Sequence, residues 1–368
     1  MKKKILIISQ TFYPENFPRS FRTTELAKEF TRQGHDVTVL IPKNDNIHNT
    51  FEKKHNIQIK DLGKQVFPSI NKRTGNKMIR MIKRISARIL FQLFDYPYGY
   101  MMFQVKKALK NEKGYDLLIS IAVPFPIHWG VAWARNKNHT ISKTWVADCG
   151  DPFYLSTTDS FKKFFYFKYL EKWFSRKADF ISIPFEELKK YFFREFKEKY
   201  RVIPQGFDFK DMLITDKPIN NEIVTFGFAG GFIKEKRDPR KFLDFLCTVD
   251  VPFKFILYNK QNEFTDNYRK ILGDKLIVKD YIPRKELLFE LSKMDFLVNI
   301  ELASNQAPSK LIDYSLVKRP ILMIKNKEFN KEIILEFLNK DYQNQFIYPD
   351  INKYNIVNVC QQFLDLTD

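Results

Sequence analysis

Apolar and polar positions along the chain form two series, and each series predicts strands and helices in alternation. In the first, short apolar runs at residues 5–9 and 37–41 flank residues 24–33, whose apolar positions recur at helical spacing up to Gly34. A strand, a helix and a strand in this order predict a parallel sheet with right-handed crossovers. Further strands of this series are predicted at residues 116–122, 144–147, 178–183 and 200–203.

The second series follows a turn with proline and glycine at residues 202–208. It predicts a helix at residues 240–247 and strands at 223–228, 253–258, 276–279, 296–300 and 321–324. Because 368 residues exceed what one core usually holds, we expect two doubly wound α/β domains, at 1–203 and 207–349. A C-terminal helix at about 350–368 is expected to pack back on the first domain. Ligands of such sheets bind beyond the carboxyl ends of the strands, which predicts a site in a cleft between the domains.

A polar loop, a helix start and a buried strand follow one another over residues 305–324. Pro308 and Ser309 suit the first turn of a helix, where unpaired N–H groups attract an anion. Lys310 adds a positive charge beside that anion, and Asp313 lies one turn further on, where its carboxylate can accept hydrogen bonds from a sugar diol. The pattern predicts a site for a phosphorylated ligand, but a capped helix packed on a sheet explains the same residues equally well.

Cysteine and histidine usage gives no indication of a disulfide framework or a metal site. The three cysteines and five histidines lack the spacing of metal ligands, and no Asp-x-Asp pair is present to hold a metal against a nucleotide diphosphate. We therefore expect no protein-bound metal, no cofactor and a reducing cytoplasm. No apolar run approaches the ~20 residues that span a bilayer, and the first residues lead into a strand without a signal-peptide pattern.

The chain carries 62 Lys and Arg against 43 Asp and Glu, a net charge of +19, which predicts attraction to polyanions. About half of this excess lies in residues 72–110, where ten basic residues accompany one acid, Asp95. Over residues 77–94 the apolar side chains gather on one side of a helix with basic residues beside them, which predicts contact with an anionic membrane surface. A nucleic-acid-binding protein would also explain the charge. However, the basic residues are accompanied by aliphatic residues and not by stacking aromatic residues, and no nucleic-acid motif is present.

Several segments, in matching order and spacing, resemble the retaining nucleotide-sugar glycosyltransferases of family 4, which have the GT-B fold. Residues 5–22 and 34–40 resemble the family's first strand, active-site loop and first helix. Residues 202–208 resemble its interdomain signature, and residues 227–239 resemble the glycine-bearing turn and basic residue that open its nucleotide domain. The resemblance covers nearly the whole chain. It implies a GT-B fold, with two Rossmann-like domains that face a central cleft.

The resemblance also implies a site for the sugar donor in the second domain. Arg237 matches the family's diphosphate-binding arginine, and Lys310 is the expected second cation. The family's Glu-x7-Glu motif falls on Asn305 to Asp313, so the spacing is kept while both glutamates are replaced. Asp313 can still accept hydrogen bonds from ribose hydroxyls, and Glu301 can supply the charge that is lost at Asn305. The donor-binding residues implied are Gly230, Gly231, Glu301, Asn305, Ser309 and Asp313.

His128 follows a buried strand and matches the segment that places an active-site histidine in the family, where it would hold the donor sugar. A structural or capping histidine is the alternative interpretation. On the acceptor side the resemblance implies Arg19, Arg22 and Asp151. For Asp151 an ordinary Asp-Gly or Asp-Pro turn is the alternative interpretation. The family's Gly-Gly pair in the first loop is replaced by residues 16–18, Asn-Phe-Pro.

The sequence therefore predicts a hexosyltransferase-type glycosyltransferase (EC 2.4) that moves a sugar from a nucleotide diphosphate to a membrane-associated, lipid-linked acceptor. Retention of configuration is implied by the resemblance alone, and the residues supply no convincing nucleophile, which favours a front-face mechanism. The expected setting is capsule- or lipopolysaccharide-type polysaccharide synthesis, peripheral on the inner face of the cytoplasmic membrane, without specific nucleic acid. A GT-B-like sugar-nucleotide 2-epimerase is the alternative, and it would need an acid and a base at the sugar and no lipid-facing helix.

Overall fold

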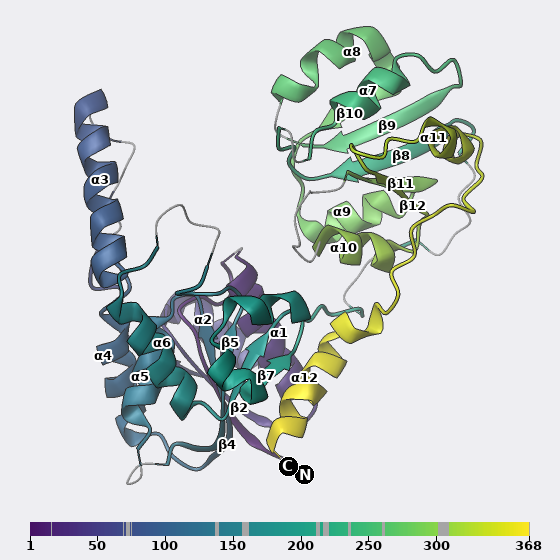
Figure 1. Cartoon of the computed structure of the whole chain (residues 1–368). Helices are drawn as coiled ribbons and strands as arrows, with labels where there is room; N and C mark the ends of the chain where they lie inside the picture. Colours follow the sequence, from purple (N-terminus) through teal and green to yellow (C-terminus); the bar gives the residue numbers. More distant parts are fainter. Residues whose placement is uncertain are drawn as a thin grey trace. The chain divides into compact units, whose positions relative to one another are not determined.

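The computed structural model describes residues 1–15, 17–68, 70, 74, 76–136, 140–156, 162–210, 214–215, 221–234, 237–259, 262–300 and 309–367. The chain divides into two compact units (Figure 1). The first consists of Met1–Phe207 together with Lys353–Asp368, and the second of Asp208–Asn352. Each unit is built on a parallel β-sheet with helices on both faces (Figure 1).

In the described part of the first unit, seven parallel strands lie in the order β3-β2-β1-β4-β5-β6-β7. These strands are β1 (Lys4–Ile8), β2 (Asp36–Ile41), β3 (Gln58–Asp61), β4 (Tyr115–Ala122), β5 (Ser142–Cys149), β6 (Phe180–Ile183) and β7 (Tyr200–Val202). The helices are α1 (Pro18–Arg32), α2 (Asp45–His55), α3 (Lys77–Phe94), α4 (Met101–Ala108), α5 (Pro126–Ala134), α6 (Tyr166–Lys177) and α12 (Ile356–Leu364). The strand order reverses at β1 and β4, which makes their carboxyl ends the switch point of a doubly wound sheet.

The first sheet is buried on both faces. Successive residues of a strand point to opposite faces, and accordingly Ile5 and Ile7 of β1 belong to one hydrophobic core while Leu6 and Ile8 belong to the other. Parallel sheets covered by helices on both faces require such continuous apolar strands. The C-terminal helix α12 packs on α1 and contributes Phe363 to the same core as Ile5.

In the described part of the second unit, five parallel strands lie in the order β10-β9-β8-β11-β12. They are β8 (Val224–Ala229), β9 (Phe253–Tyr258), β10 (Leu276–Lys279), β11 (Phe296–Ile300) and β12 (Ile321–Ile324). The helices are α7 (Arg240–Leu246), α8 (Asp266–Leu272), α9 (Arg284–Leu291), α10 (Ser309–Val317) and α11 (Lys331–Leu338). On one face of this sheet Phe226 stacks on Phe255 and Phe296 of the neighbouring strands, with ring centroids 4.7 and 4.6 Å away.

The prediction of two doubly wound α/β sheets is confirmed, and the predicted helix at residues 77–94 is α3 itself. Helix α1 begins at Pro18, before the predicted start at residue 24, because proline fits the first helical position, where no N–H is needed. Strand β3 was not predicted, because its residues are mostly polar and it lies at the edge of the sheet. None of the helices in the described part of the chain is long and apolar enough to cross a membrane.

Candidate functional site

A sharp turn at the carboxyl end of β8 brings the backbone close to a cation. Gly230 has a φ of 125°, a conformation that residues with side chains rarely adopt, and its N–H donates to the carbonyl oxygen of Tyr258 at 3.0 Å. A Cβ atom at position 230 would lie only 2.7 Å from Nζ of Lys310. Glycine is therefore needed here both for the turn and for the approach of the lysine.

The ammonium group of Lys310 is enclosed at the start of α10. Its Nζ lies 3.8 Å from the ring centroid of Phe228, a cation–π contact, and none of the described residues offers it a hydrogen-bond acceptor. Burial, and then the positive charge of Arg237, lower the pKa of Lys310 well below its ordinary value. A buried cation is costly to a fold unless negative charge pairs with it, and no acid in the described part of the chain does so for Lys310.

Arg237 is the second cation at the same turn. Its backbone exchanges hydrogen bonds with that of Ile233, at 2.8 and 3.0 Å, and its Nη1 donates to the carbonyl oxygen of Gly231 at 3.4 Å. Nε has no acceptor among the described residues, and burial lowers the pKa of the guanidinium. Within the described part of the chain neither Arg237 nor Lys310 pairs with an acid. Two such cations, with the N–H groups at the start of α10, suit a diphosphate.

Asp313 also lies on α10, where it has a partner that the sequence analysis did not identify. Arg284, the first residue of α9, donates to Oδ1 of Asp313 through Nη2 at 2.5 Å and through Nε at 3.1 Å. Burial raises the pKa of Asp313, against the opposing effect of Arg284. The carboxylate is thus held by the arginine, which orients it for a second hydrogen-bonding partner.

A pocket of about 500 Å³ opens at the carboxyl ends of β9 and β10. Its lining consists of Tyr258, Lys279, Asp280, Ile282, Lys285, Glu286, Phe289 and Glu290. The hydroxyl group of Tyr258 is buried with no described partner, and burial raises its pKa to about 12. Because the carbonyl of Tyr258 bonds Gly230, the pocket adjoins the glycine turn. This pocket was not predicted from the sequence, although the ends of two adjacent parallel strands were the signal that could have located it.

In the first unit, a buried carboxylate gathers the two predicted arginines. Asp148, near the end of β5, accepts from Nε and Nη2 of Arg22 at 3.2 and 2.8 Å and from Nη1 of Arg19 at 3.2 Å. The hydroxyl of Ser182 donates to it at 2.7 Å. Burial alone would raise the pKa of Asp148, but the two guanidinium groups outweigh burial and hold the pKa below its ordinary value. This role of Asp148 was not predicted from the sequence, although the residue follows a predicted strand.

The two arginines differ in what they can still bind. Arg22 is buried, and its remaining N–H groups donate to the carbonyl oxygens of Ile203 and Pro204, so its side chain serves the fold. Arg19 has a side chain that is 20% exposed and lies directly over Gly150. The predicted acceptor-side residue Asp151 is exposed next to that glycine. Arg19, and not Arg22, is therefore the arginine that can reach a ligand.

Glu171 of α6 also holds the loop after β5, through a hydrogen bond from the backbone of that loop. The N–H of Tyr154 donates to Oε2 of Glu171 at 2.8 Å, while Oε1 is buried with no partner in the described residues. Burial raises the pKa of Glu171 to about 7. This carboxyl group therefore titrates near neutral pH beneath the loop that carries Gly150 and Asp151.

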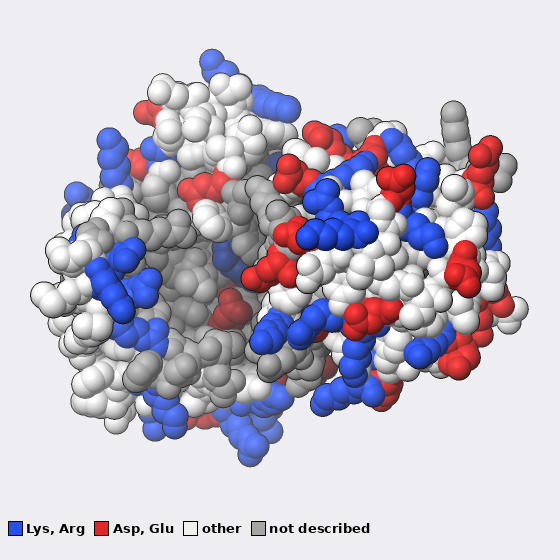
Figure 2. Space-filling view, turned by 90° about the horizontal axis from the view of Figure 1, so that it is seen from above, with Lys and Arg blue, Asp and Glu red and all other residues white. Residues whose placement is uncertain are grey.

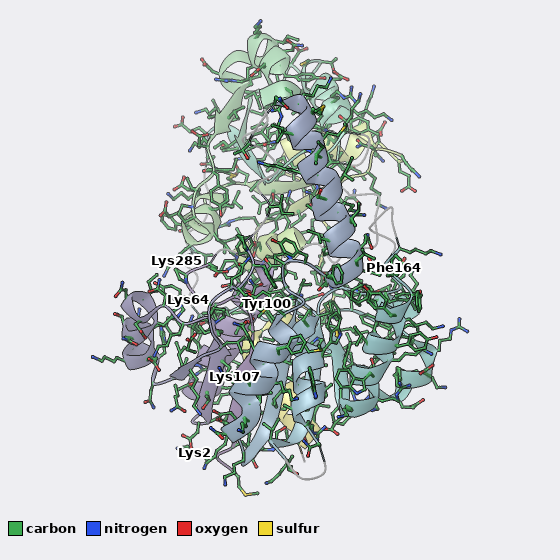
Figure 3. The ribbon with its side chains drawn as sticks, turned by 90° about the vertical axis from the view of Figure 1, so that its left-hand side faces the viewer. Lys2, Lys64, Tyr100, Lys107, Phe164 and Lys285 are labelled. Atoms are coloured by element: carbon green, nitrogen blue, oxygen red, sulfur yellow. The ribbon has the colours of Figure 1, made fainter. Side chains whose placement is uncertain are left out.

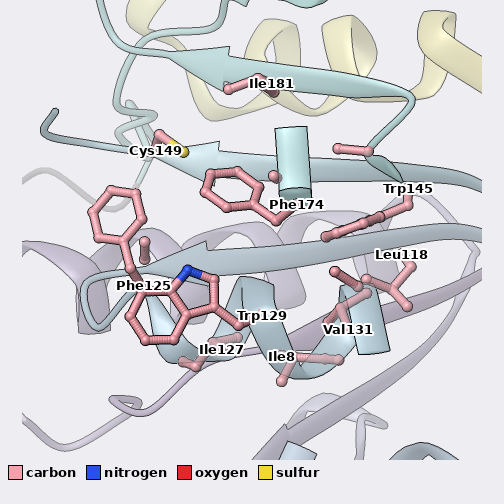
Figure 4. Close-up of a cluster of buried hydrophobic side chains, with 14 of the residues drawn as sticks. Ile8, Leu118, Phe125, Ile127, Trp129, Val131, Trp145, Cys149, Phe174 and Ile181 are labelled. Atoms are coloured by element: carbon pink, nitrogen blue, oxygen red, sulfur yellow. The ribbon is translucent and has the colours of Figure 1, made fainter. Parts of the chain in front are cut away.

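His128 is enclosed in the core of the first unit, and this departs from the sequence prediction. Its imidazole is fully buried, with Phe125 and Phe174 against it. These two phenylalanines belong to the cluster of buried side chains shown in Figure 4. Ser120 Oγ lies 2.8 Å from Nδ1 and Cys149 Sγ lies 3.5 Å from Nε2. Burial lowers its pKa to about 3, so the ring is neutral. A role in holding the donor sugar requires a histidine that reaches the surface, and the geometry here supports the structural alternative.

Some predicted residues lie outside the described part of the chain. Glu301 and Asn305 are among these, and Ser309 is described only as the first residue of α10. The structure thus brings together Gly230, Lys310 and Arg237 in the second unit. In the first it gathers the two arginines around Asp148. Across the described residues, no three His, Cys, Asp or Glu side chains are grouped as metal ligands.

Helix α3 carries an exposed apolar face beside its basic residues. Met78, Ile82, Ile85 and Ile89 follow one another at helical spacing, and each side chain is more than half exposed. Ala87 is the one residue of the helix that is buried. Elsewhere basic and acidic side chains are interspersed over much of the face seen in Figure 2, so that face does not present one continuous basic surface.

Solved structures with low sequence identity share the architecture of the whole chain. A glycosyltransferase from Rickettsia africae ESF-5 is 12% identical with a TM-score of 0.60, and covers 100% of this chain and 98% of its own. Anabaena Alr3699/HepE in complex with UDP and glucose is 12% identical with a TM-score of 0.53, covering 100% and 96%. The apo form of WaaB, a lipopolysaccharide outer core galactosyltransferase, is 12% identical with a TM-score of 0.56, covering 99% and 98%.

The sequence itself identifies the family. No curated protein sequence matches the chain significantly. The model of Glycosyltransferase Family 4 matches residues 21–211, which is more than half of the 368 residues. Together with the two doubly wound sheets, this match confirms the predicted GT-B fold and the predicted activity class. The chain belongs to Glycosyltransferase Family 4 and is a glycosyltransferase of the GT-B type.

Proposed function

We propose that this enzyme transfers a hexose from a nucleoside diphosphate sugar to a lipid-linked glycan acceptor at a membrane surface, with retention of configuration. The observation that carries the donor side is the pair of cations at the Gly230 turn, Lys310 and Arg237, which have no acidic partner among the described residues. The Anabaena HepE structure contains UDP and glucose, which supports a donor of this class.

The diphosphate of the donor binds against Lys310 and Arg237 and the first turn of α10. When the bond between the anomeric carbon and the diphosphate oxygen breaks, negative charge develops on that oxygen. A fixed guanidinium and a buried ammonium stabilise this charge strongly, because little water competes with them. The protein cations thus neutralise the leaving group, and we propose that no resident metal is needed.

The nucleoside occupies the pocket at the carboxyl ends of β9 and β10, which adjoins the glycine turn through the backbone bond between Gly230 and Tyr258. A pocket of about 500 Å³ with mixed polar and apolar lining is of the size that holds a small molecule. Asp313, oriented by Arg284, accepts hydrogen bonds from the ribose hydroxyls. Glu301 and Asn305 remain proposed contacts of the donor sugar.

Retention follows a front-face path in this proposal. The acceptor hydroxyl attacks the anomeric carbon from the side that the diphosphate leaves, and its proton passes to the departing diphosphate oxygen. Arg19, which is held over Gly150 by Asp148, contacts the acceptor together with Asp151. His128 holds the strand ends beneath this loop and does not touch the sugar.

The membrane part of the proposal rests on α3. Four large apolar side chains stand more than half exposed along one face of the helix, and basic residues flank them. An amphipathic basic helix of this kind lies in the interface of an anionic bilayer. We therefore place the enzyme on the inner face of the cytoplasmic membrane, in surface polysaccharide synthesis, and the likeness to a lipopolysaccharide galactosyltransferase supports this setting.

A ligand-stabilisation screen over UDP, GDP and ADP and their sugars tests the donor site. The matching nucleotide at ~100 times its dissociation constant should stabilise the protein by about 2.7 kcal/mol. The same screen on Lys310→Ala and Arg237→Ala should show a much smaller effect, while Lys254→Ala, an exposed lysine on β9, should respond like the wild type. Equal stabilisation of all four proteins would remove the proposed phosphate site.

Flotation with vesicles tests the membrane contact. A variant in which Arg80, Lys83, Arg84 and Arg88 are all reversed to Glu should fail to float with anionic vesicles, since each basic residue near the surface contributes about 1 kcal/mol. Its transfer to a soluble acceptor analogue should persist, and its transfer to a lipid-linked acceptor should fall. Equal flotation of the variant and the wild type would contradict the membrane assignment.

A further inference from the structure

Three large aromatic side chains at the start of α6 are exposed. Residues 162–169, the aromatic segment, read Lys-Lys-Phe-Phe-Tyr-Phe-Lys-Tyr. Phe164, Phe165 and Tyr169 are 46%, 65% and 61% exposed, whereas Phe167 is buried in the core of the first unit. Phe167 therefore anchors the segment in the core, and the three exposed rings lie on the surface.

Lys163 joins this segment to the end of α3. Its Nζ lies 2.6 Å from Oδ1 of Asp95, the residue that caps α3, and both side chains are nearly buried. The same Nζ lies 3.5 Å from the ring centroid of Phe91, in the last turn of α3. In Figure 3, Phe164 lies beside the end of α3 that joins the body of the unit. The aromatic segment and the helix are thus fixed to each other by an ion pair and a cation–π contact.

The charges around the segment favour an anionic partner. Lys162 and Lys168 form no ion pair with an acid in the described part of the chain. Aromatic rings with lysines beside them are the composition found where a protein meets a lipid surface, because the rings enter the headgroup region and the ammonium groups meet lipid phosphates. Single exposed apolar side chains are common on protein surfaces and need no explanation. Three neighbouring exposed rings, in contrast, form an apolar patch of the kind that marks an interaction site.

We propose that the aromatic segment is a second membrane-binding element, and that it forms one continuous membrane-binding surface with α3. Its partner is an anionic lipid bilayer. The inference rests on the proposed membrane function of α3 and extends it to a region of the chain with a different structure. Two linked contacts bind a surface more tightly than either contact alone, since the second is made without a new loss of freedom. Because the two contacts lie at different places on the first unit, they also prevent that unit from turning about the axis of α3 on the membrane.

The test compares flotation of full-length variants with vesicles of phosphatidylcholine and phosphatidylglycerol. Phe165→Ser/Tyr169→Ser should lower the vesicle partition coefficient by on the order of tenfold or more, because two exposed rings no longer enter the interface. The matched control is Ile271→Ser/Ile347→Ser, which removes two equally exposed apolar side chains from the second unit and should bind like the wild type. Far-UV circular dichroism and a cooperative thermal transition like that of the wild type serve as the check that each variant is folded.

A second variant keeps the proposal testable if the serines impair folding. Phe165→Trp retains an aromatic ring with a stronger preference for the lipid interface, so it should bind vesicles as tightly as the wild type or more tightly. A loss of binding in Phe165→Trp would overturn the inference.

The outcomes separate this inference from the proposed membrane function. If reversal of the α3 charges abolishes flotation while Phe165→Ser/Tyr169→Ser floats like the wild type, the aromatic segment is not a membrane element, but the function of α3 stands. If the wild type itself does not float, both proposals fail. If the serine variant changes the oligomeric state in size-exclusion chromatography and leaves flotation unchanged, the patch is a contact between copies of the chain and the inference is wrong.

Discussion

Gly150→Ala tests whether Arg19 is held over the loop that follows β5. A Cβ atom at position 150 would lie 1.8 Å from Nη2 and 2.1 Å from Cζ of Arg19, whereas ordinary contact begins at 3.4 Å. The guanidinium must therefore move by on the order of 2 Å. The φ angle of Gly150 is outside the left-handed region, so alanine adds no backbone strain and its effect passes through Arg19.

The magnitude follows from the contact that is lost. Moving the guanidinium breaks the 3.2 Å hydrogen bond from Nη1 of Arg19 to Asp148. Asp148 keeps Arg22 and Ser182, so the buried carboxylate stays paired. The loss is one charge-assisted hydrogen bond, about 1–2 kcal/mol, at the lower end of the usual range because part of the Arg19 side chain is open to solvent. Each kcal/mol that is lost lowers the melting temperature by about 2–4 °C.

A double-mutant cycle separates the steric effect from any other. Gly150→Ala should lower the melting temperature of the wild type and leave that of Arg19→Ala unchanged, because alanine at position 19 vacates the space. The same non-additivity should hold for the initial rate of sugar transfer if Arg19 contacts the acceptor. Equal destabilisation by Gly150→Ala in both backgrounds would refute the reasoning, since the new methyl group would then act on something other than Arg19.

Four further substitutions test the remaining sites. Lys310→Ala and Arg237→Ala should each lower turnover by on the order of 10²-fold without unfolding the protein, because the leaving diphosphate loses a cation, and near-wild-type steady-state rates in both would contradict this. Asp313→Asn should weaken the binding of a nucleoside diphosphate in calorimetry, since an amide accepts fewer ribose hydrogen bonds, and unchanged affinity would contradict the assignment. The raised pKa of Glu171, about 7, means that the folded state holds its proton more tightly than the unfolded state, so stability should fall as pH rises from about 4.5 to 7. Glu171→Gln should flatten this part of the stability profile in denaturant titrations, and an unchanged slope would show that the carboxyl group is ordinary.

Strands and helices could be predicted where the local pattern and the tertiary burial agree. Four strands of the second unit, β9 to β12, begin and end at the predicted residues, because each is a short, mainly apolar run that pairs with a neighbouring strand of the parallel sheet. Strand β3, Gln58–Asp61, has one apolar residue inside a polar stretch, and it becomes a strand only because β2 offers a free edge. A sequence cannot reveal that edge before the fold is known.

The candidate site divides in the same way. The turn at Gly230 and the place of Lys310 at the start of a helix could be predicted, because a glycine after an apolar run and a lysine at a helix start are local signals. The pairing of Arg284 with Asp313 could not, since it joins residues 29 apart on two helices. The burial of His128 was not predicted, although a signal existed: helix α5, Pro126–Ala134, is apolar on all sides, and a polar residue inside such a helix is enclosed.

Helix α3 shows why periodicity alone does not determine what covers an apolar face. Met78, Ile82, Ile85 and Ile89 have the spacing of any core-facing stripe, and a buried helix would read the same. What distinguishes α3 is the composition of the rest of its surface, where basic residues flank the stripe and no acid occurs between residues 77 and 94. A core-facing helix needs no such excess of one charge, whereas a bilayer with anionic headgroups attracts it. The exposure of the stripe and the sign of its flanking charge therefore favour a lipid surface over a protein core as the cover for this face.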